Sequence, residues 1–341
     1  PGLQAMAENP NTTIFKKYFN ASTPTITGII SQLCSLLPPT GHEEIENSDK
    51  YRSHRLLCLP EILKNSGWQN AFYFTSVPKT FAHKDTIFAS MGMDKVFGQH
   101  ELADIINEEP LSWGYSDHQL FPVVWQIAKE QNKTPWLITY STVDNHPPYN
   151  LAKDEVIFSD GKNKVLNSVH TTDDAFKNFW QEFQNSEYAS NTIVIAVADH
   201  AIFPQALNND YFAENDRDLY PYDENMLMMY IPNNILPKEV DVLSSGIDFT
   251  PTLLHMFNIN LKNSFEGWSI FGERQNYQNI LGMHEIGLYI NEENKKIQYN
   301  DPNILNCDEN NSSQTGNLTL CDLKELFIWK KAMLLEGRFW K

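Results

Sequence analysis

The sequence predicts an α/β fold in which helices flank a mostly parallel central sheet. Short apolar runs of strand length alternate along the chain with longer runs of helical spacing. One of the short runs, NTIVIAVAD at 191–199, is an almost unbroken series of β-branched and small apolar residues. Such a run is typical of a parallel strand that is buried on both faces, and alternation of strands with helices is typical of α/β proteins.

The expected elements follow the same two patterns. Strands are expected at 71–76, 135–142, 191–199 and 225–232. Helices are expected at 59–67, 118–131, 173–186 and 249–259, and another begins within 20–38. After about residue 275 the pattern weakens into short strands, a polar loop and a final amphipathic helix, LCDLKELFIWKKAMLL. We therefore expect a core domain at 1–275 and a small C-terminal α+β subdomain at 276–341 that packs on it.

Composition excludes some classes of partner. The chain has 341 residues and a formal net charge of −17, which argues against nucleic acid and against electrostatic docking on anionic lipid. No apolar run approaches the roughly 20 residues of a membrane span. The sequence does not begin with Met and carries no signal peptide, so we interpret it as a fragment or an excised soluble domain.

The four cysteines form two different groups. Cys307 and Cys321 bracket the polar loop CDENNSSQTGNLTLC, and a bridge there would stabilise the protein by about 3 kcal/mol through loop closure. We expect that bridge, with two free thiols as the alternative. Cys34 and Cys58 lie in apolar contexts and are expected to be buried free thiols. Neither pair has the spacing of a metal site.

One stretch is unusually rich in hydroxyl groups. The segment NASTPTITGIISQLCSLLP at 20–38 begins with polar residues and continues as an apolar helix. Five hydroxyl side chains stand at its start: Ser22, Thr23, Thr25, Thr27 and Ser31. The free N–H groups and the dipole of a helix N-terminus favour an anion. A capping role for one hydroxyl is the ordinary alternative.

Other polar residues stand where strands or helices are expected to end or begin. Ligands of open α/β sheets bind at the carboxyl ends of the strands. Asp199 and His200 leave the strand at 191–199, and their side chains could bind one divalent cation. His146 follows another strand in VDNHPPY, and Trp113 and Asp117 lie in WGYSD before a helix. Taken singly, each has a structural alternative: a capping Asp with a solvated His, a loop His, and a helix cap with an aromatic staple.

The order of these motifs resembles a known family. A hydroxyl-rich helix start is followed by W-G-x-x-D, then T-x-x-N-H-P-P-Y, then N-T-I-V-I-x-x-x-D-H. This series is similar to the sulfatase and phosphoglycerol-transferase branch of the alkaline-phosphatase superfamily, and within it to the lipoteichoic acid synthase-like phosphoglycerol transferases. The motifs run through residues 12–258. The segments at 91–99 and 246–259 resemble further family landmarks that carry no obvious chemistry.

The resemblance implies roles for individual residues. Counting back from Pro38 places Thr25 at the position of the family nucleophile. The Cys that sulfatases oxidise to formylglycine is absent there, so sulfate-ester hydrolysis by that route is disfavoured. The segment Ser22-Thr23-Pro24-Thr25 can also be aligned with the family's nucleophile motif, which keeps Ser22 as a minor alternative for the nucleophile.

The resemblance also implies a metal site and a substrate site. Thr25, Asp199 and His200 would bind one divalent metal ion. Mn²⁺ is the metal expected, and Zn²⁺ and Mg²⁺ are the alternatives. His146 would bind the phosphate or assist proton transfer, and Trp113 and Asp117 would line a glycerol pocket.

The implied reaction is the transfer of phosphoglycerol from a phospholipid headgroup to a glycan or polyol-phosphate acceptor. The implied location is outside the cytoplasm, on a parent protein anchored in the membrane by helices before residue 1. The alternatives are a phosphoethanolamine transferase, a sulfuric-ester hydrolase, or an inactive binding or regulatory domain with the same fold. The segment 201–230 contains no histidine, which by the resemblance favours phosphoglycerol over phosphoethanolamine transfer.

The family also carries an acidic metal ligand at the end of its first strand. That strand would lie before residue 1, and Glu8, in a polar and non-strand context, is a poor substitute. Two alternatives therefore stay open: the sequence begins inside a longer protein, or its metal site lacks this ligand.

Overall fold

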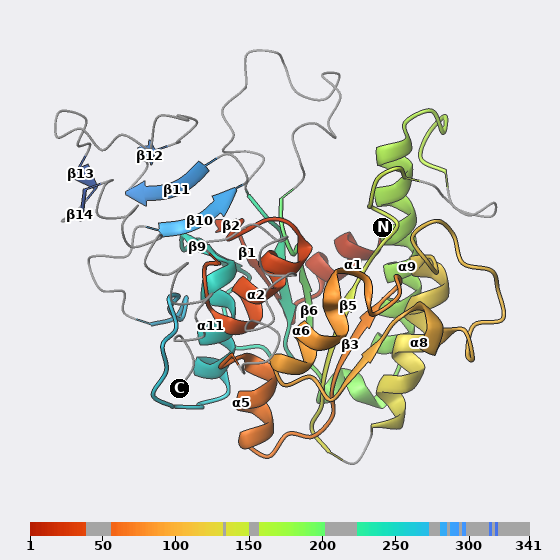
Figure 1. The fold of residues 1–341 in the computed structure, drawn as a ribbon, viewed down its shortest axis with the longest axis horizontal. Helices are drawn as coiled ribbons and strands as arrows, with labels where there is room; N and C mark the ends of the chain where they lie inside the picture. The colour runs from red at the N-terminus through yellow and green to blue at the C-terminus, as the bar shows by residue number, and fades with distance from the viewer. Residues whose placement is uncertain are drawn as a thin grey trace. The chain divides into compact units, whose positions relative to one another are not determined.

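A computed structural model describes most of the chain, in two compact units (Figure 1). The described residues are 1–38, 56–131, 134–149, 157–201 and 224–272, together with the backbone of five later strands. The first unit comprises Pro1–Ile14, Pro60–Ala196 and Met228–Val240. The second unit comprises Phe15–Leu59, Val197–Leu227 and Asp241–Lys341. Each unit is described separately.

The first unit contains a parallel sheet of three strands in the order β4-β3-β5. The strands are β3 (Ala71–Thr75), β4 (Lys95–Phe97) and β5 (Leu137–Ser141). Phe72 pairs with Lys95 on one side and with Ile138 on the other, both in parallel. All five residues of β3 are buried, as expected for the central strand of such a sheet.

A second sheet, which belongs mostly to the first unit, has the order β6-β7-β1-β8. Its strands are β1 (Thr12–Phe15), β6 (Val194–Val197), β7 (Leu227–Tyr230) and β8 (Glu239–Val240). Strand β1 runs antiparallel to β7. The sequence predicted strands at the places of β3, β5, β6 and β7, and all four are present. It did not predict β1.

Helices α1, α8 and α9 pack together in the first unit (Figure 1). They span Gly2–Glu8, Asp117–Glu130 and Lys164–Gln184. Their shared core is rich in aromatic rings: Trp125, Phe176, Trp180, Phe183 and Tyr230. Aromatic side chains bury a large apolar area, so this cluster is a main source of the unit's stability.

Smaller helices complete the first unit. They are α5 (Leu59–Asn65), α6 (Lys84–Ser90), α7 (Gln99–Leu102) and the 3₁₀ turns at Phe81–His83 and Glu187–Ser190. The predicted helix at 173–186 is the second half of α9. Its first turns were missed because they are polar, although Asn163 caps them by accepting a 3.0 Å hydrogen bond from the Leu166 N–H.

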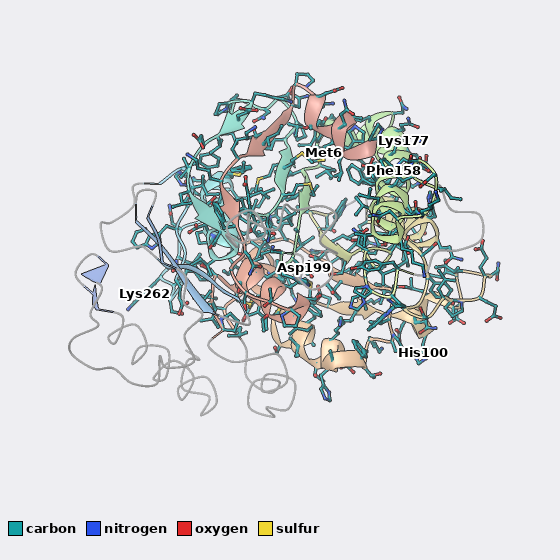
Figure 2. All side chains as sticks on the ribbon, turned by 90° about the horizontal axis from the view of Figure 1, so that it is seen from above. Met6, His100, Phe158, Lys177, Asp199 and Lys262 are labelled. Carbon is teal, nitrogen blue, oxygen red and sulfur yellow. A yellow bond between two sulfur atoms is a disulfide. The ribbon has the colours of Figure 1, made fainter. Side chains whose placement is uncertain are left out.

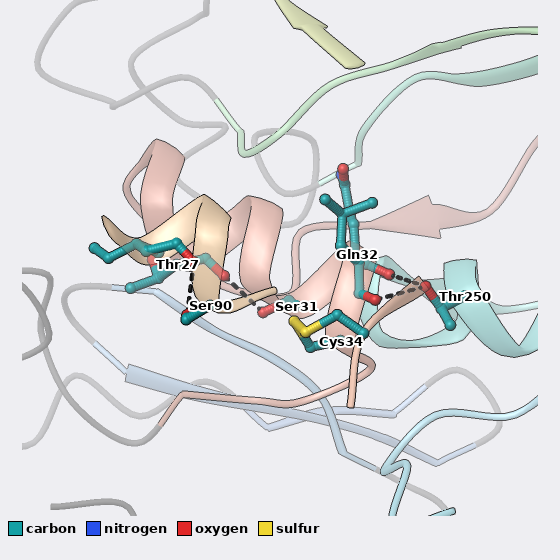
Figure 3. The surroundings of a disulfide bond; sticks show 9 residues. Thr27, Ser31, Gln32, Cys34, Ser90 and Thr250 are labelled. Atoms are coloured by element: carbon teal, nitrogen blue, oxygen red, sulfur yellow. Dashed lines mark hydrogen bonds between the residues drawn. A yellow bond between two sulfur atoms is a disulfide. The ribbon is translucent and has the colours of Figure 1, made fainter. Parts of the chain in front are cut away.

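The second unit is centred on α2 (Thr25–Cys34) and α11 (Phe249–Met256). The hydroxyl of Thr250 on α11 lies 2.7 and 3.0 Å from the carbonyl oxygens of Gln32 and Leu33 (Figure 3). These carbonyls belong to the last turn of α2, which has no later helical N–H to bind them. The unit also holds the parallel pair β2 (Tyr18–Phe19) and β9 (Ser244–Ser245), and the 3₁₀ turn Gly246–Asp248. Its later strands are Ile280–His284, Gly287–Glu292, Lys295–Ile297, Gln314–Thr315 and Leu318–Thr319.

A disulfide bond joins Cys34 to Cys58, and the expectation of free thiols at these positions was wrong (Figure 3). The two Cα atoms lie 4.0 Å apart across a sequence separation of 24 residues. The chain returns to the end of α2 just before α5, a tertiary contact that neither sequence context reveals. Cys307 and Cys321 lie outside the described residues, and their bridge stays a prediction.

The α/β fold class is confirmed, with one difference in detail. Strand β6 is half-buried, whereas the sequence predicted burial on both faces. This strand stands at the end of its sheet order, so among the described strands of that sheet only β7 pairs with it. Among the described helices, none has the length and apolar character that crossing a membrane requires. The predicted boundary between 275 and 276 stays a prediction.

Candidate active site

Thr25 is the first residue of α2. The preceding residue, Pro24, stands at the N-cap position and provides no side-chain cap. Two hydroxyls further along the helix bond to its own backbone: Thr27 Oγ1 to the Pro24 carbonyl at 2.8 Å, and Ser31 Oγ to the Thr27 carbonyl at 2.9 Å. Thr25 is half-buried, and its position among the free N–H groups of the helix start suits contact with an anion.

The competing hydroxyl at position 22 is less accessible. Ser22 is 3% exposed and Thr23 is 7% exposed. An external substrate therefore reaches neither hydroxyl without movement of the surrounding chain. Of the hydroxyls before α2 and in its first residue, Thr25 is the most accessible.

The exit of β6 lies directly against the first turn of α2. A Cβ atom at Gly28 would lie only 2.2 Å from the carbonyl oxygen of Asp199. The side-chain N–H of Gln32, one turn later, donates a 2.6 Å hydrogen bond to the Ala198 carbonyl. Figure 2 shows Asp199 beside the red ribbon of this helix. Thr25 and Gly28 are three residues apart and share a helix face, so the backbone of Asp199 lies on the face that bears Thr25.

The two ring nitrogens of His200 have different surroundings. Its Nδ1 lies 2.7 Å from the carbonyl oxygen of Ala201, and a carbonyl can only accept, so Nδ1 carries the proton. The lone pair is then on Nε2, as in histidines that bind metals. Nε2 lies 3.8 Å from Asp199 Oδ2. Ligand atoms each about 2.0–2.2 Å from one ion can lie up to about 4 Å apart, so this pair fits a shared ion.

The carboxylate, imidazole and hydroxyl groups of Asp199, His200 and Thr25 are of kinds that bind divalent cations. Within the described residues, no group of three or more His, Cys, Asp and Glu side chains forms a metal cluster. Asp199 and His200 would supply two ligands, and a hydroxyl oxygen from Thr25 would supply a third. Three protein ligands and an open position are typical of a catalytic site. Glu8, the poor substitute for a further acidic ligand, is an exposed residue at the end of α1 in the first unit.

Trp113 and His146 form a second cluster, in the first unit. Their ring centroids lie 4.0 Å apart, and the rings of Phe81 and Trp113 are nearly perpendicular with centroids 5.6 Å apart. A small pocket beside them is lined by Leu111, Ser112, Trp113, Gly114, Val143, Asp144 and His146. His146 is exposed, and its Nδ1 lies 2.7 Å from the Pro147 carbonyl, which leaves Nε2 available to a ligand.

Asp117 is bonded to two residues that line this pocket, Val143 and Asp144, and has no exposed surface. Its carboxylate accepts hydrogen bonds from the Tyr140 hydroxyl, the Val143 and Asp144 N–H groups, and the Thr172 hydroxyl. Burial raises the pKa of the Tyr140 phenol well above its usual range, and the negative charge of Asp117 adds to this rise. The predicted contact between Asp117 and a substrate would require one of these donors to give way.

The structure thus groups the predicted residues by unit. Thr25, Asp199 and His200 belong to the second unit, and Trp113, Asp117 and His146 to the first. Sequence reasoning missed Gly28, Gln32, Tyr140 and Asp144. Only Gly28 left a signal, because an isolated glycine in an apolar helix often marks a close approach of another backbone.

Comparison with known proteins decides the family. A family model described as sulfatase matches residues 1–259. The chain belongs to the sulfatase family. Curated relatives include a phosphoglycerol transferase I from Xanthomonas axonopodis pv. citri (strain 306), 25% identical over 250 residues, and another from Xanthomonas euvesicatoria pv. vesicatoria (strain 85-10), 24% identical over 282 residues. These alignments cover 70% and 79% of this chain but only 34% and 39% of the relatives.

Solved structures confirm the alkaline-phosphatase/sulfatase-like fold. The lipoteichoic acid synthase LtaP from Listeria monocytogenes matches with a TM-score of 0.74 at 18% identity, over 99% of this chain and 85% of that one. An alkaline phosphatase superfamily protein from Vibrio parahaemolyticus matches with a TM-score of 0.70 at 18% identity, over 100% and 82%. The C-terminal periplasmic domain of EptC from Escherichia coli, in complex with Zn, matches with a TM-score of 0.56 at 15% identity, over 88% and 85%.

Proposed function

We propose that this chain is part of a metal-dependent phosphoglycerol transferase whose nucleophile is Thr25. The observation that carries the proposal is the contact between the first turn of α2 and Asp199, where a Cβ at Gly28 would lie 2.2 Å from the Asp199 carbonyl oxygen. This backbone contact supports the proposal that the helix-start threonine acts together with a carboxylate and an imidazole. The sequence relatives named phosphoglycerol transferase I support the same reaction class.

The covalent step begins at the Thr25 hydroxyl. Its Oγ1 attacks the phosphorus of a phospholipid headgroup diester, and the bond from phosphorus to the diacylglycerol oxygen breaks. Diacylglycerol leaves as the free alcohol after taking up a proton, and phosphoglycerol stays on Thr25 as a phosphodiester. A hydroxyl of a glycan or polyol-phosphate acceptor then attacks the same phosphorus and releases Thr25. Two easier steps thus replace a difficult one.

The chain's own groups prepare these steps. The free N–H groups at the start of α2 offer hydrogen bonds to phosphoryl oxygens. Asp199 and His200 Nε2 would hold a divalent ion, Mn²⁺ in the first place, with Zn²⁺ or Mg²⁺ as alternatives. When bound, such an ion lowers the pKa of a coordinated hydroxyl and offsets negative charge on the phosphoryl group.

His146 and Trp113 are proposed to act on the substrate. The indole of Trp113 and the imidazole of His146, tilted by 44° with centroids 4.0 Å apart, offer apolar faces to a glycerol moiety. Nε2 of His146 can bind a phosphate oxygen or carry a proton. The family resemblance further supports a location outside the cytoplasm, with the parent protein anchored in the membrane. The matched structure of a periplasmic EptC domain supports the same location.

Other functions of the fold are distinguishable. A phosphoethanolamine transferase would use a different headgroup, a sulfuric-ester hydrolase would release sulfate, and a binding or regulatory domain would do neither. Threonine at the nucleophile position disfavours the sulfatase route. The matches to phosphoglycerol transferases favour phosphoglycerol as the transferred group.

The test is a transfer assay with the full-length parent protein. Vesicles of phospholipid with phosphoglycerol headgroups and Mn²⁺ are supplied, and diacylglycerol release is measured, with ethanolamine-headgroup vesicles in parallel. We expect release from the phosphoglycerol lipid only, its loss in Thr25→Ala, and near-normal release in the control Ser22→Ala. Release that survives in Thr25→Ala would overturn the nucleophile assignment. Release from the ethanolamine lipid alone would overturn the assigned substrate.

A further inference from the structure

A buried carboxylate ties together the parts of the first unit that support the Trp113 and His146 pocket. Asp117 has no exposed surface and accepts hydrogen bonds from three different parts of the chain. Tyr140 belongs to β5, Val143 and Asp144 to the loop that follows it, and Thr172 to α9. The distances from Val143 N, Asp144 N and Thr172 Oγ1 are 2.9, 3.2 and 2.7 Å.

Asp117 and Asp144 bind each other in both directions. While Asp117 accepts the N–H of Asp144, its own N–H donates to Asp144 Oδ2 at 2.9 Å. Asp117 is also the first residue of α8, where the helix dipole favours a negative charge. The start of α8 and the loop after β5 are therefore held by hydrogen bonds in both directions.

His146 belongs to the same loop after β5, which Asp117 holds through Val143 and Asp144. The backbone N–H of His146 donates to the Val143 carbonyl at 2.8 Å. A tight turn therefore connects the residues bound by Asp117 to the imidazole. Val143, Asp144 and His146 all line the pocket. A movement of the Val143 and Asp144 backbone would thus move the His146 ring away from Trp113, whose centroid is 4.0 Å away.

A carboxylate with four protein donors has little capacity left for a substrate. Burying a charge is costly unless hydrogen bonds compensate for the lost water, and here both oxygens are already used. We propose that Asp117 is a positioning residue: it fixes the 143–146 loop and thereby sets the His146 ring over Trp113, and it does not contact the substrate. The role in turnover rests on the proposed function, in which His146 serves the phosphoglycerol donor.

Asp173 provides a matched control in the same unit. Its carboxylate also accepts two backbone N–H groups, those of Gly2 and Leu3 at 3.0 and 2.7 Å, but these lie at the start of α1. Asp117→Asn and Asp173→Asn both remove one buried charge at constant shape. Only the first loosens the loop that carries His146.

The experiment compares the two variants in the full-length protein by amide hydrogen exchange and by transfer kinetics. In Asp117→Asn we expect exchange at Val143 and Asp144 to accelerate at least about tenfold, and KM for phosphoglycerol-headgroup vesicles to rise about 10- to 100-fold, since a shift of about 1 Å has effects of that size. Asp173→Asn should accelerate exchange at the start of α1 and leave KM unchanged.

Two results would overturn the proposal: unchanged exchange at 143–144 in Asp117→Asn, or an equal rise in KM in both variants. If the wild type transfers nothing, the proposed function fails, and exchange alone decides whether Asp117 holds the loop. If Asp117→Asn does not fold, Thr172→Val removes one of the four donors instead. A smaller rise in exchange and in KM is then expected, and no rise in either would refute the positioning role.

Discussion

The substitution Gly28→Ala tests the contact on which the active-site assignment depends. A Cβ at this position would lie 2.2 Å from the Asp199 carbonyl oxygen and 2.9 Å from its carbonyl carbon. The shorter distance is 1.2 Å below the 3.4 Å at which ordinary van der Waals contact begins. The backbone of Asp199 and the first turn of α2 must therefore separate by about 1 Å, and both are main chain with no flexible side chain to turn aside.

Two effects of opposite sign act on the stability of Gly28→Ala. Alanine is a better helix former than glycine by about 1 kcal/mol, which alone would stabilise α2. Overpacking costs about 1–3 kcal/mol, so we expect no net stabilisation and a loss of up to about 2 kcal/mol. The larger effect falls on the site, because displacement of Asp199 from the face of Thr25 should weaken binding of Mn²⁺ or Zn²⁺ by about tenfold or more.

Calorimetric titration with Mn²⁺ and Zn²⁺ and thermal unfolding measure the two effects. The control is Gly272→Ala, where the nearest atom to the added Cβ is 3.4 Å away, and both quantities should there stay near wild type. A Gly28→Ala protein that is more stable than wild type and binds the metal equally well would show that α2 and Asp199 are not in contact as described.

Three further predictions concern the cysteines and Asp199, the proposed metal ligand. Cys34→Ser should lower the free energy of unfolding by about 3 kcal/mol, the chain-entropy value for a separation of 24 residues. Urea unfolding with and without a reductant measures this change. No difference in the free energy of unfolding would mean that the bond contributes little. Cys307 and Cys321 should appear in one cross-linked peptide in non-reducing mass spectrometry, and free thiols there would refute the bridge. Asp199→Asn should transfer slowly and recover in part at raised Mn²⁺, whereas full activity at ordinary Mn²⁺ would remove Asp199 from the ligand set.

Local sequence patterns predicted four strands of the two main sheets, β3, β5, β6 and β7, and a helix that begins near Thr25. The run before Asp199 is apolar and β-branched, so the strand and its exit could be predicted from composition alone. The five hydroxyls at the start of α2 could not be ranked in the same way. Thr27 and Ser31 bond to helix carbonyls and Ser22 is buried, and these facts depend on how the helix begins and what packs over it.

Features that depend on tertiary contacts were predicted poorly. The Cys34–Cys58 bond joins segments whose proximity no local pattern encodes. For Asp117 the sequence offered two interpretations, a helix cap and a pocket residue. In the structure Ser116 is the N-cap residue, in a capping box with Gln119, and Asp117 binds the loop after β5 instead. That role requires three distant segments to meet, so it could not be read from WGYSD alone.

The central claim is that Thr25 becomes covalently phosphorylated during transfer. The most direct measurement is mass spectrometry of the full-length protein after incubation with phosphoglycerol-headgroup vesicles and Mn²⁺, without an acceptor. We expect a phosphoglycerol adduct on Thr25 that persists in Ser22→Ala and disappears in Thr25→Ala. An adduct on Ser22, or diacylglycerol release by a Thr25→Ala protein, would contradict it.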